Sequence, residues 1–134
     1  MLPFQFVVAG VPVSLQTRNR PRLQAWKELV AVAAEEIWPS DAPDDGDVEF
    51  QLTLYYDGAP PDVDNVIKPI QDALVGIVYV DDVQVVKTSS RKRDINGSYR
   101  IRHANAALLQ AFSEGTDFVH VLVTRFVESG DLNA

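Results

Sequence analysis

Residues 48–56 alternate between apolar and polar side chains more regularly than any other part of the chain. The apolar side of this alternation comprises Val48, Phe50, Leu52, Leu54 and Tyr56. Successive side chains of a strand point to opposite faces, so this spacing predicts a strand with one buried face. The rest of the fold has to supply the sheet partners and the layer that covers that face.

A helix is predicted between this strand and a short first strand at residues 4–8. Apolar residues recur there at spacings of three and four, which is one helical stripe, and they follow Pro21, a good residue for a first helical turn. The stripe consists of Leu23, Trp26, Val30, Ala34 and Ile37. Pro39 and the acidic segment behind it end the helix, so residues 39–47 are predicted to be an acidic loop.

The second half of the chain predicts five more elements. A helix is expected from residues 62–64 to about Val75, although Pro69 would disturb its first turns. A strand over 80–88 leads through a basic stretch to a hairpin turn at Asn96-Gly97, with a returning strand at 98–103. A helix at 106–112 and a strand at 119–123 complete the chain. The order β-α-β-α-β-β-α-β predicts an α/β (α+β) fold, a small mixed β-sheet with flanking helices.

Composition supports an ordinary globular protein. The chain has 134 residues, of which 46% are hydrophobic and 23% charged. That predicts a single domain over 1–134 with a frayed tail at 129–134. The absence of cysteine excludes disulfides, Cys-ligated metals and a thiol nucleophile. No apolar run reaches the length of about 18 residues that a membrane span needs, and the N-terminus lacks the basic residues of a signal peptide. A cytoplasmic location is therefore expected.

Charge is unevenly distributed along the chain. The formal net charge is −7, but seven acidic residues fall between 35 and 49 with no basic residue among them. Two basic clusters lie elsewhere, and screening lets a local basic face bind phosphates on an acidic protein. The candidate phosphate contacts are Arg18, Arg20, Arg22, Lys87, Arg91, Lys92 and Arg93. The alternative is that these runs are ordinary solvated surface.

Residues 61–86 hold five carboxylates and one lysine. A strand–helix–strand unit would bring Asp62, Asp64 and either Asp81 or Asp82 together. Clustered carboxylates repel unless a cation neutralises them, and oxygen-only ligands favour Mg²⁺ or Mn²⁺. Such a site suits metal-assisted phosphodiester hydrolysis by metal-activated water, with Lys68 near the phosphate.

Each of these carboxylates also has a purely structural interpretation. Asp64 and Asp62 would suit a helix N-terminus, and Asp81 and Asp82 a turn. The spacing of four that places Asp64, Lys68 and Asp72 on one helix face would also make an ordinary surface ion-pair ladder.

The stretch nevertheless resembles a known family in four ordered elements. They are DVDN at 62–65, Lys68, DAL at 72–74 and DDVQV at 81–85. This pattern is similar to the core of the RusA family of Holliday junction resolvases, or crossover junction endodeoxyribonucleases. The resemblance is close over residues 61–86, and segment 98–113 is expected to be an insertion relative to the shortest members.

The resemblance implies an enzyme and assigns its site. It implies a homodimer that cuts four-way DNA junctions by paired symmetric nicks with Mg²⁺, for which Mn²⁺ could substitute. Asp62, Asp64 and Asp82 would bind metal and Lys68 would be catalytic, with Asp81 a further possible ligand. Asn65 and Asp72 would support the site, Asp72 by orienting Lys68. Two hypotheses remain beside it, a non-catalytic dimer that binds branched DNA and an acidic protein-interaction domain.

Overall fold

The computed structural model describes residues 1–60, 62–100, 106–128 and 130. Its elements are β1 (Phe4–Ala9), α1 (Arg20–Glu35), β2 (Val48–Tyr56), α2 (Ile67–Ala73), a 3₁₀ turn η1 (Asp82–Gln84), β3 (Val85–Asp94), α3 (Ala106–Glu114) and β4 (Phe118–Arg125). The four strands form one sheet in the order β1-β4-β2-β3. β2 and β3 are parallel, and the other two pairs are antiparallel. The predicted mixed α/β fold is therefore confirmed.

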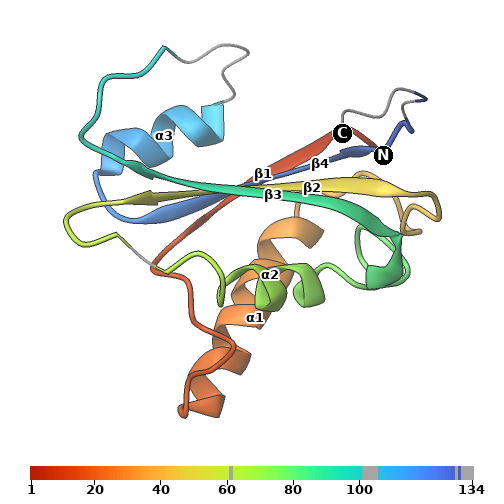
Figure 1. Cartoon of the computed structure of the whole chain (residues 1–134), viewed down its shortest axis with the longest axis horizontal. Coiled ribbons are helices and arrows are strands. Elements are labelled where there is room, and N and C mark those ends of the chain that lie inside the picture. Colours follow the sequence, from red (N-terminus) through yellow and green to blue (C-terminus); the bar gives the residue numbers. More distant parts are fainter. Residues whose placement is uncertain (61, 101–105, 129, 131–134) are drawn as a thin grey trace.

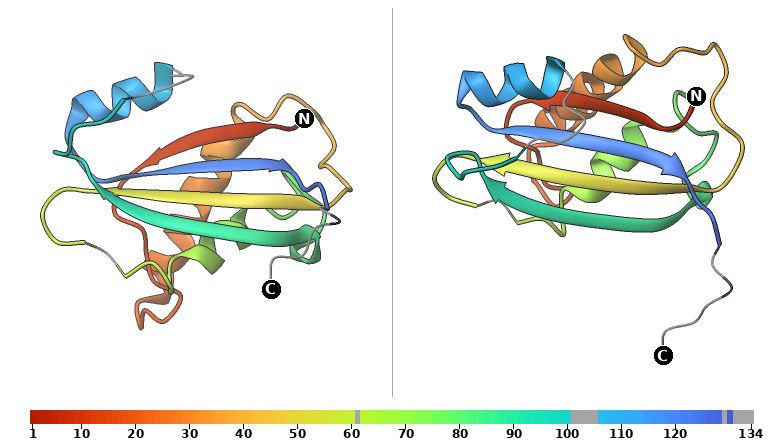
Figure 2. Two further views of the ribbon diagram at one scale, coloured as in Figure 1. Left: turned by 45° about the horizontal axis from the view of Figure 1, so that its top comes forward. Right: turned by 90° about the horizontal axis from the view of Figure 1, so that it is seen from above.

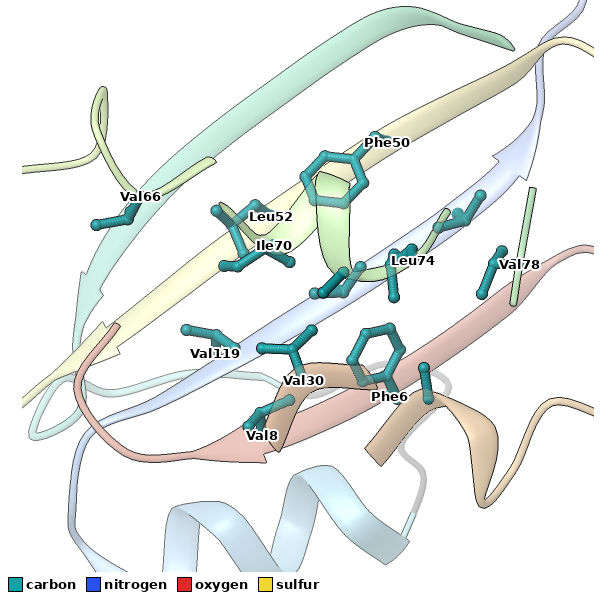
Figure 3. Close-up of a cluster of buried hydrophobic side chains, with 14 of the residues drawn as sticks. Phe6, Val8, Val30, Phe50, Leu52, Val66, Ile70, Leu74, Val78 and Val119 are labelled. Carbon is teal, nitrogen blue, oxygen red and sulfur yellow. The ribbon is translucent and has the colours of Figure 1, made fainter. Parts of the chain in front are cut away.

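The sheet has a different helical cover on each face. Figure 1 shows α1 and α2 on one side and α3 on the other. The main core lies on the α1–α2 side, where Phe50 and Leu52 of β2 meet Val30 of α1 and Ile70 of α2 (Figure 3). The alternation in 48–56 thus turns its apolar side toward these two helices, as predicted.

α1 forms where the sequence predicts it, with one difference at its end. Asn19 caps its N-terminus by accepting a hydrogen bond from the Arg22 N–H at 3.1 Å, and Pro21 lies in the first turn. The helix ends at Glu35, so the last residue of the predicted stripe, Ile37, lies beyond it. Its side chain is 52% exposed rather than buried.

α2 is shorter than predicted. It begins at Ile67 rather than at residues 62–64, so Pro69 falls in its first turn, where a missing N–H disrupts no helical hydrogen bond. Asp64 lies in the turn before the helix. The predicted ladder of three residues on one helix face was therefore wrong, since only Lys68 and Asp72 share α2.

β3 runs further along the chain than predicted. It occupies Val85–Asp94 instead of 80–88, which places the whole basic stretch inside a strand at the edge of the sheet. A turn does follow, with the Gly97 N–H bonded to the Asp94 carbonyl at 3.0 Å. No returning strand forms at 98–100, and the rest of that predicted strand, 101–103, lies outside the described residues. The order within the described residues is thus β-α-β-α-β-α-β, with four strands where the sequence predicted five.

Candidate active site

Lys68 lies between two carboxylates. Its Nζ is 2.6 Å from Asp82 Oδ2 and 2.9 Å from Asp72 Oδ1. The hydrogen bond to Asp82, followed by that to Asp72, raises the pKa of Lys68, and the same bond from Lys68 lowers the pKa of Asp82. The three side chains are between 31% and 44% exposed, so they remain accessible to a substrate.

Asp82 lies in the turn η1, and Gln84 holds that turn in place. The Gln84 side chain is only 8% exposed. Its Oε1 accepts hydrogen bonds from the Val80 and Asp81 N–H groups at 2.8 and 3.0 Å, while Asp81 accepts one from the Val83 N–H. This is a capping box around three residues. The resemblance included Gln84 without giving it a role, although a Gln three residues after Asp81 is the spacing of a capping box.

The other end of Gln84 binds the acidic loop. Gln84 Nε2 donates to the carbonyl oxygens of Asp44 and Gly46, both at 2.8 Å. The Asp44 N–H in turn donates to the Val78 carbonyl at 2.8 Å. Segments 40 residues apart in sequence are therefore joined through a single amide.

Asp44 itself points inward and pairs with β4. Arg125 donates to both Asp44 carboxylate oxygens, at 2.9 and 2.7 Å. Burial opposes ionisation of Asp44, but the Gly46 N–H and the Arg125 guanidinium outweigh it and lower the pKa of Asp44. A Cβ at Gly46 would lie 2.0 Å from Arg125 Nη1, so glycine allows this close approach. The predicted acidic loop is thus fastened to the fold at its centre.

Asp62 and Asp64 are held much less firmly. Both are exposed, and the Asp64 N–H donates to Asp62 Oδ1 at 3.2 Å within the same turn. The next residue, Asn65, anchors the turn because its carbonyl accepts from the Leu15 N–H at 2.8 Å. Within the described ranges, no group of three or more Asp, Glu, His or Cys side chains is arranged to hold a metal ion. The donor chemistry suits Mg²⁺, since Asp62, Asp64 and Asp82 offer only carboxylate oxygens. The positive charge beside Asp82 is the Lys68 ammonium group, whose Nζ lies 2.6 Å from Asp82 Oδ2.

The predicted phosphate contacts fall into three places. Arg18, Arg20 and Arg22 lie exposed at the start of α1. The alternation of β3 divides the others between the two faces of the sheet. Gln71 Nε2 of α2 donates to Thr88 Oγ1 at 3.0 Å, so Thr88 faces α2. Lys92 lies four residues further along the strand and therefore faces the same side. Lys87, Arg91 and Arg93 therefore lie on the opposite face. The basic stretch does not form one surface.

Comparison with known proteins identifies the class as DNA-cutting enzymes. A family model described as endodeoxyribonuclease RusA matches residues 8–102, a range that includes Asp62, Lys68 and Asp82. The chain belongs to the RusA family of endodeoxyribonucleases, which confirms the resemblance to Holliday junction resolvases. Comparison with the curated proteins found no match. None of the described helices is long and apolar enough to span a membrane.

Proposed function

We propose that this protein resolves four-way DNA junctions by paired, symmetric, metal-dependent nicks. The observation that carries the proposal is the Lys68 ammonium group held between Asp82 and Asp72 at an accessible surface. The pairing keeps the ammonium charged at neutral pH, because both carboxylates raise the pKa of Lys68. A fixed positive charge of this kind is suited to the extra negative charge on a phosphate under attack.

Asp62, Asp64 and Asp82 are the proposed ligands of Mg²⁺, with Mn²⁺ as a substitute and Asp81 as a further candidate. A bound divalent cation supplies Lewis-acid activation of water and stabilises charge at the phosphate. Asp82 contacts Lys68 through Oδ2 alone, so its Oδ1 would be available to a metal ion. Lys68 also has a second partner, Asp72. Asp72 would then orient Lys68 toward the phosphate. The bond of Asp81 to the Val83 N–H indicates a capping role that competes with metal binding.

Two nicks across a symmetric junction require two sites, and a C2 homodimer supplies them. Arg18, Arg20, Arg22 and Lys92 are proposed phosphate contacts on the side of the sheet that carries Lys68. Lys87, Arg91 and Arg93 are proposed contacts on the other side. Each contact removed should lower the slope of log affinity against log salt by roughly one.

The test is cleavage of an end-labelled four-way junction, beside a linear duplex, with Mg²⁺, Mn²⁺ or EDTA. We expect paired nicks in the junction alone, abolished by EDTA and by Asp82→Asn, with junction binding retained in that variant. Asp45→Asn is the matched control, because Asp45 is an exposed acid in the loop that binds Gln84. Full cleavage by Asp82→Asn would overturn the proposed site. A gel shift without nicking in any metal would favour the non-catalytic DNA-binding dimer. If the protein neither binds nor nicks the junction, the third hypothesis is favoured, in which the acidic loop is a protein-binding surface.

A further inference from the structure

The face of the sheet opposite Lys68 contains a groove that includes the proposed phosphate contacts Arg91 and Arg93, and whose aromatic walls have no role in the proposed cleavage. It encloses about 410 Å³ between α3 and the outer sides of the strands. In Figure 2, right, α3 lies on the β1 side of this face. Its Phe112 reaches Tyr55 near the end of β2, with the ring centroids 4.9 Å apart. The groove residues that matter here are Arg91, Arg93, Tyr99, Arg100, Phe112 and His120.

The groove concentrates positive charge in a protein of net charge −7. Three arginines line it, no carboxylate does, and within the described residues none of the three forms an ion pair. Arg91 Nε donates to Thr53 Oγ1 at 3.2 Å, which fixes the direction of its guanidinium group. Arg93 lies over the Tyr99 ring, 5.3 Å from its centroid. Unpaired arginines in a concave site attract an anion with several charges.

The walls of the groove are aromatic as well as basic. Tyr99 and Phe112 are half-buried, with ring centroids 5.8 Å apart, and they lie over the buried ring of Tyr55. His120 adds polarity without charge: burial first, and then Arg91, lower its pKa, and its Nε2 lies 2.8 Å from Gln5 Oε1. The site thus offers flat apolar surface directly beside the guanidinium groups.

We infer that this groove binds single-stranded nucleic acid, with phosphates on Arg91, Arg93 and Arg100 and an unpaired base against Tyr99 and Phe112. A basic groove with aromatic side chains is the usual way in which proteins bind single strands. A duplex buries its base faces in stacking, so it could use the arginines but not the aromatic walls. An acidic peptide could pair with the arginines, but it has no planar rings to stack on the aromatic walls.

The location gives the groove a use during junction binding. It lies on the opposite side of the sheet from Lys68 and Asp82, so a strand held there would not block the candidate active site. A junction with unpaired nucleotides near its crossover could contact both faces of one protomer. The inference does not require cleavage, and it can fail or succeed independently of the proposed function.

The experiment measures fluorescence anisotropy of a labelled oligothymidylate and of a duplex of equal length, in EDTA and at several salt concentrations. We expect the single strand to bind more tightly than the duplex. Replacing both arginines (Arg91→Gln with Arg93→Gln) should weaken single-strand binding at least tenfold and lower the salt slope by about 1.4. Tyr99→Leu should weaken it about tenfold with an unchanged slope, because stacking releases no counterions.

Lys27→Gln is the control, since it also removes one positive charge and Lys27 belongs to α1, on the other side of the sheet from the groove. It should leave single-strand affinity unchanged. Circular dichroism melts of every variant separate loss of binding from loss of folding. Three results would overturn the inference: an equal loss of affinity in Lys27→Gln, equal affinity for a polyglutamate peptide, or unchanged single-strand binding together with a lower oligomeric state in the arginine variant. The last would identify the groove as an interface between copies of this chain.

Discussion

The two acidic segments of the motif are held in very different ways. The turn that carries Asp82 is fixed by a capping box, by the buried Gln84 amide and by the acidic loop behind it. The turn that carries Asp62 and Asp64 has backbone bonds from Val66 to Val63 and from Leu15 to Asn65, but both carboxylates are exposed. The one side-chain hydrogen bond between the two acids runs from the Asp64 N–H to Asp62 Oδ1 at 3.2 Å. Of the three proposed ligands, one (Asp82) thus lies in a firmly held turn, and two (Asp62 and Asp64) project from an exposed one.

Aspartates that look alike in the sequence therefore have different roles in the structure. Asp44 is an acid that stabilises the fold from the inside, through Arg125. Asp62 and Asp64 are exposed acids, and their proposed role is to bind a metal ion. Removing Gln84, which fixes the turn of Asp82, should damage folding, and removing Asp62 or Asp64 should damage only binding.

The largest effect is expected from Gln84→Leu. The change leaves two carbonyls and two N–H groups without their side-chain partner, and each buried unsatisfied group costs about 1–3 kcal/mol. We expect a loss of about 3 kcal/mol in the free energy of unfolding, measured by urea denaturation. Gln71→Leu is the matched control, because this equally buried amide makes one side-chain hydrogen bond, to Thr88, and should lose about 1 kcal/mol. Equal losses would show that the acidic loop does not hold the turn.

Arg125→Met should produce a smaller, pH-dependent effect. The folded-state pKa of Asp44 is below its unfolded value, so its contribution to stability is present above that unfolded value and is lost as pH falls through the folded one. The variant should lose about 1 kcal/mol at pH 7, since Arg125 is half-exposed and solvent screens the pair. The difference from the parent should narrow in acid. Thermal melts across pH 3–7 test this, and a difference that stayed constant with pH would contradict it.

Lys68→Met should have a larger effect on the pKa of Asp82 than on the free energy of unfolding. Without the ammonium group, the pKa of Asp82 should rise toward the ordinary aspartate value, which carboxyl NMR can follow directly. In the converse experiment, Asp82→Asn should lower the pKa of Lys68 more than Asp72→Asn does, because Asp82 is its stronger partner. A larger fall in the pKa of Lys68 in Asp72→Asn would show that Lys68 pairs mainly with Asp72 and not with the turn that carries Asp82.

The smallest effect on stability is expected from Asp62→Asn and Asp64→Asn. Both side chains are exposed, so the free energy of unfolding should stay within about 0.5 kcal/mol of the parent. Affinity for Mn²⁺, measured by paramagnetic resonance, should nevertheless fall in each variant. A loss of more than about 1 kcal/mol in the free energy of unfolding of either variant would show that the turn of Asp62 and Asp64 also stabilises the fold.

Sequence reasoning was most accurate where one local pattern dominated. The alternation in 48–56 and the stripe from Leu23 to Ala34 both gave the observed elements, since a buried face imposes its period on the chain. It was wrong at 80–84, where a strand was predicted and the turn η1 forms, and at 98–100, where no strand forms. The pairing of β3 with β2 decided that register instead, and Val83 is 76% exposed in η1.

The sequence alone identified the family, because Asp62, Lys68 and Asp82 belong to a motif confined to a short stretch of the chain. The family match over residues 8–102 bears out that resemblance. Tertiary structure alone decided which acids face inward and which basic residues share a surface. Asp44 and Arg125 are 81 residues apart, and no local pattern joins them. Arg91 and Lys92 are adjacent, yet the pleat of β3 sends them to opposite faces. Contacts made across a sheet depend on register and topology, which are properties of the whole chain rather than of any segment.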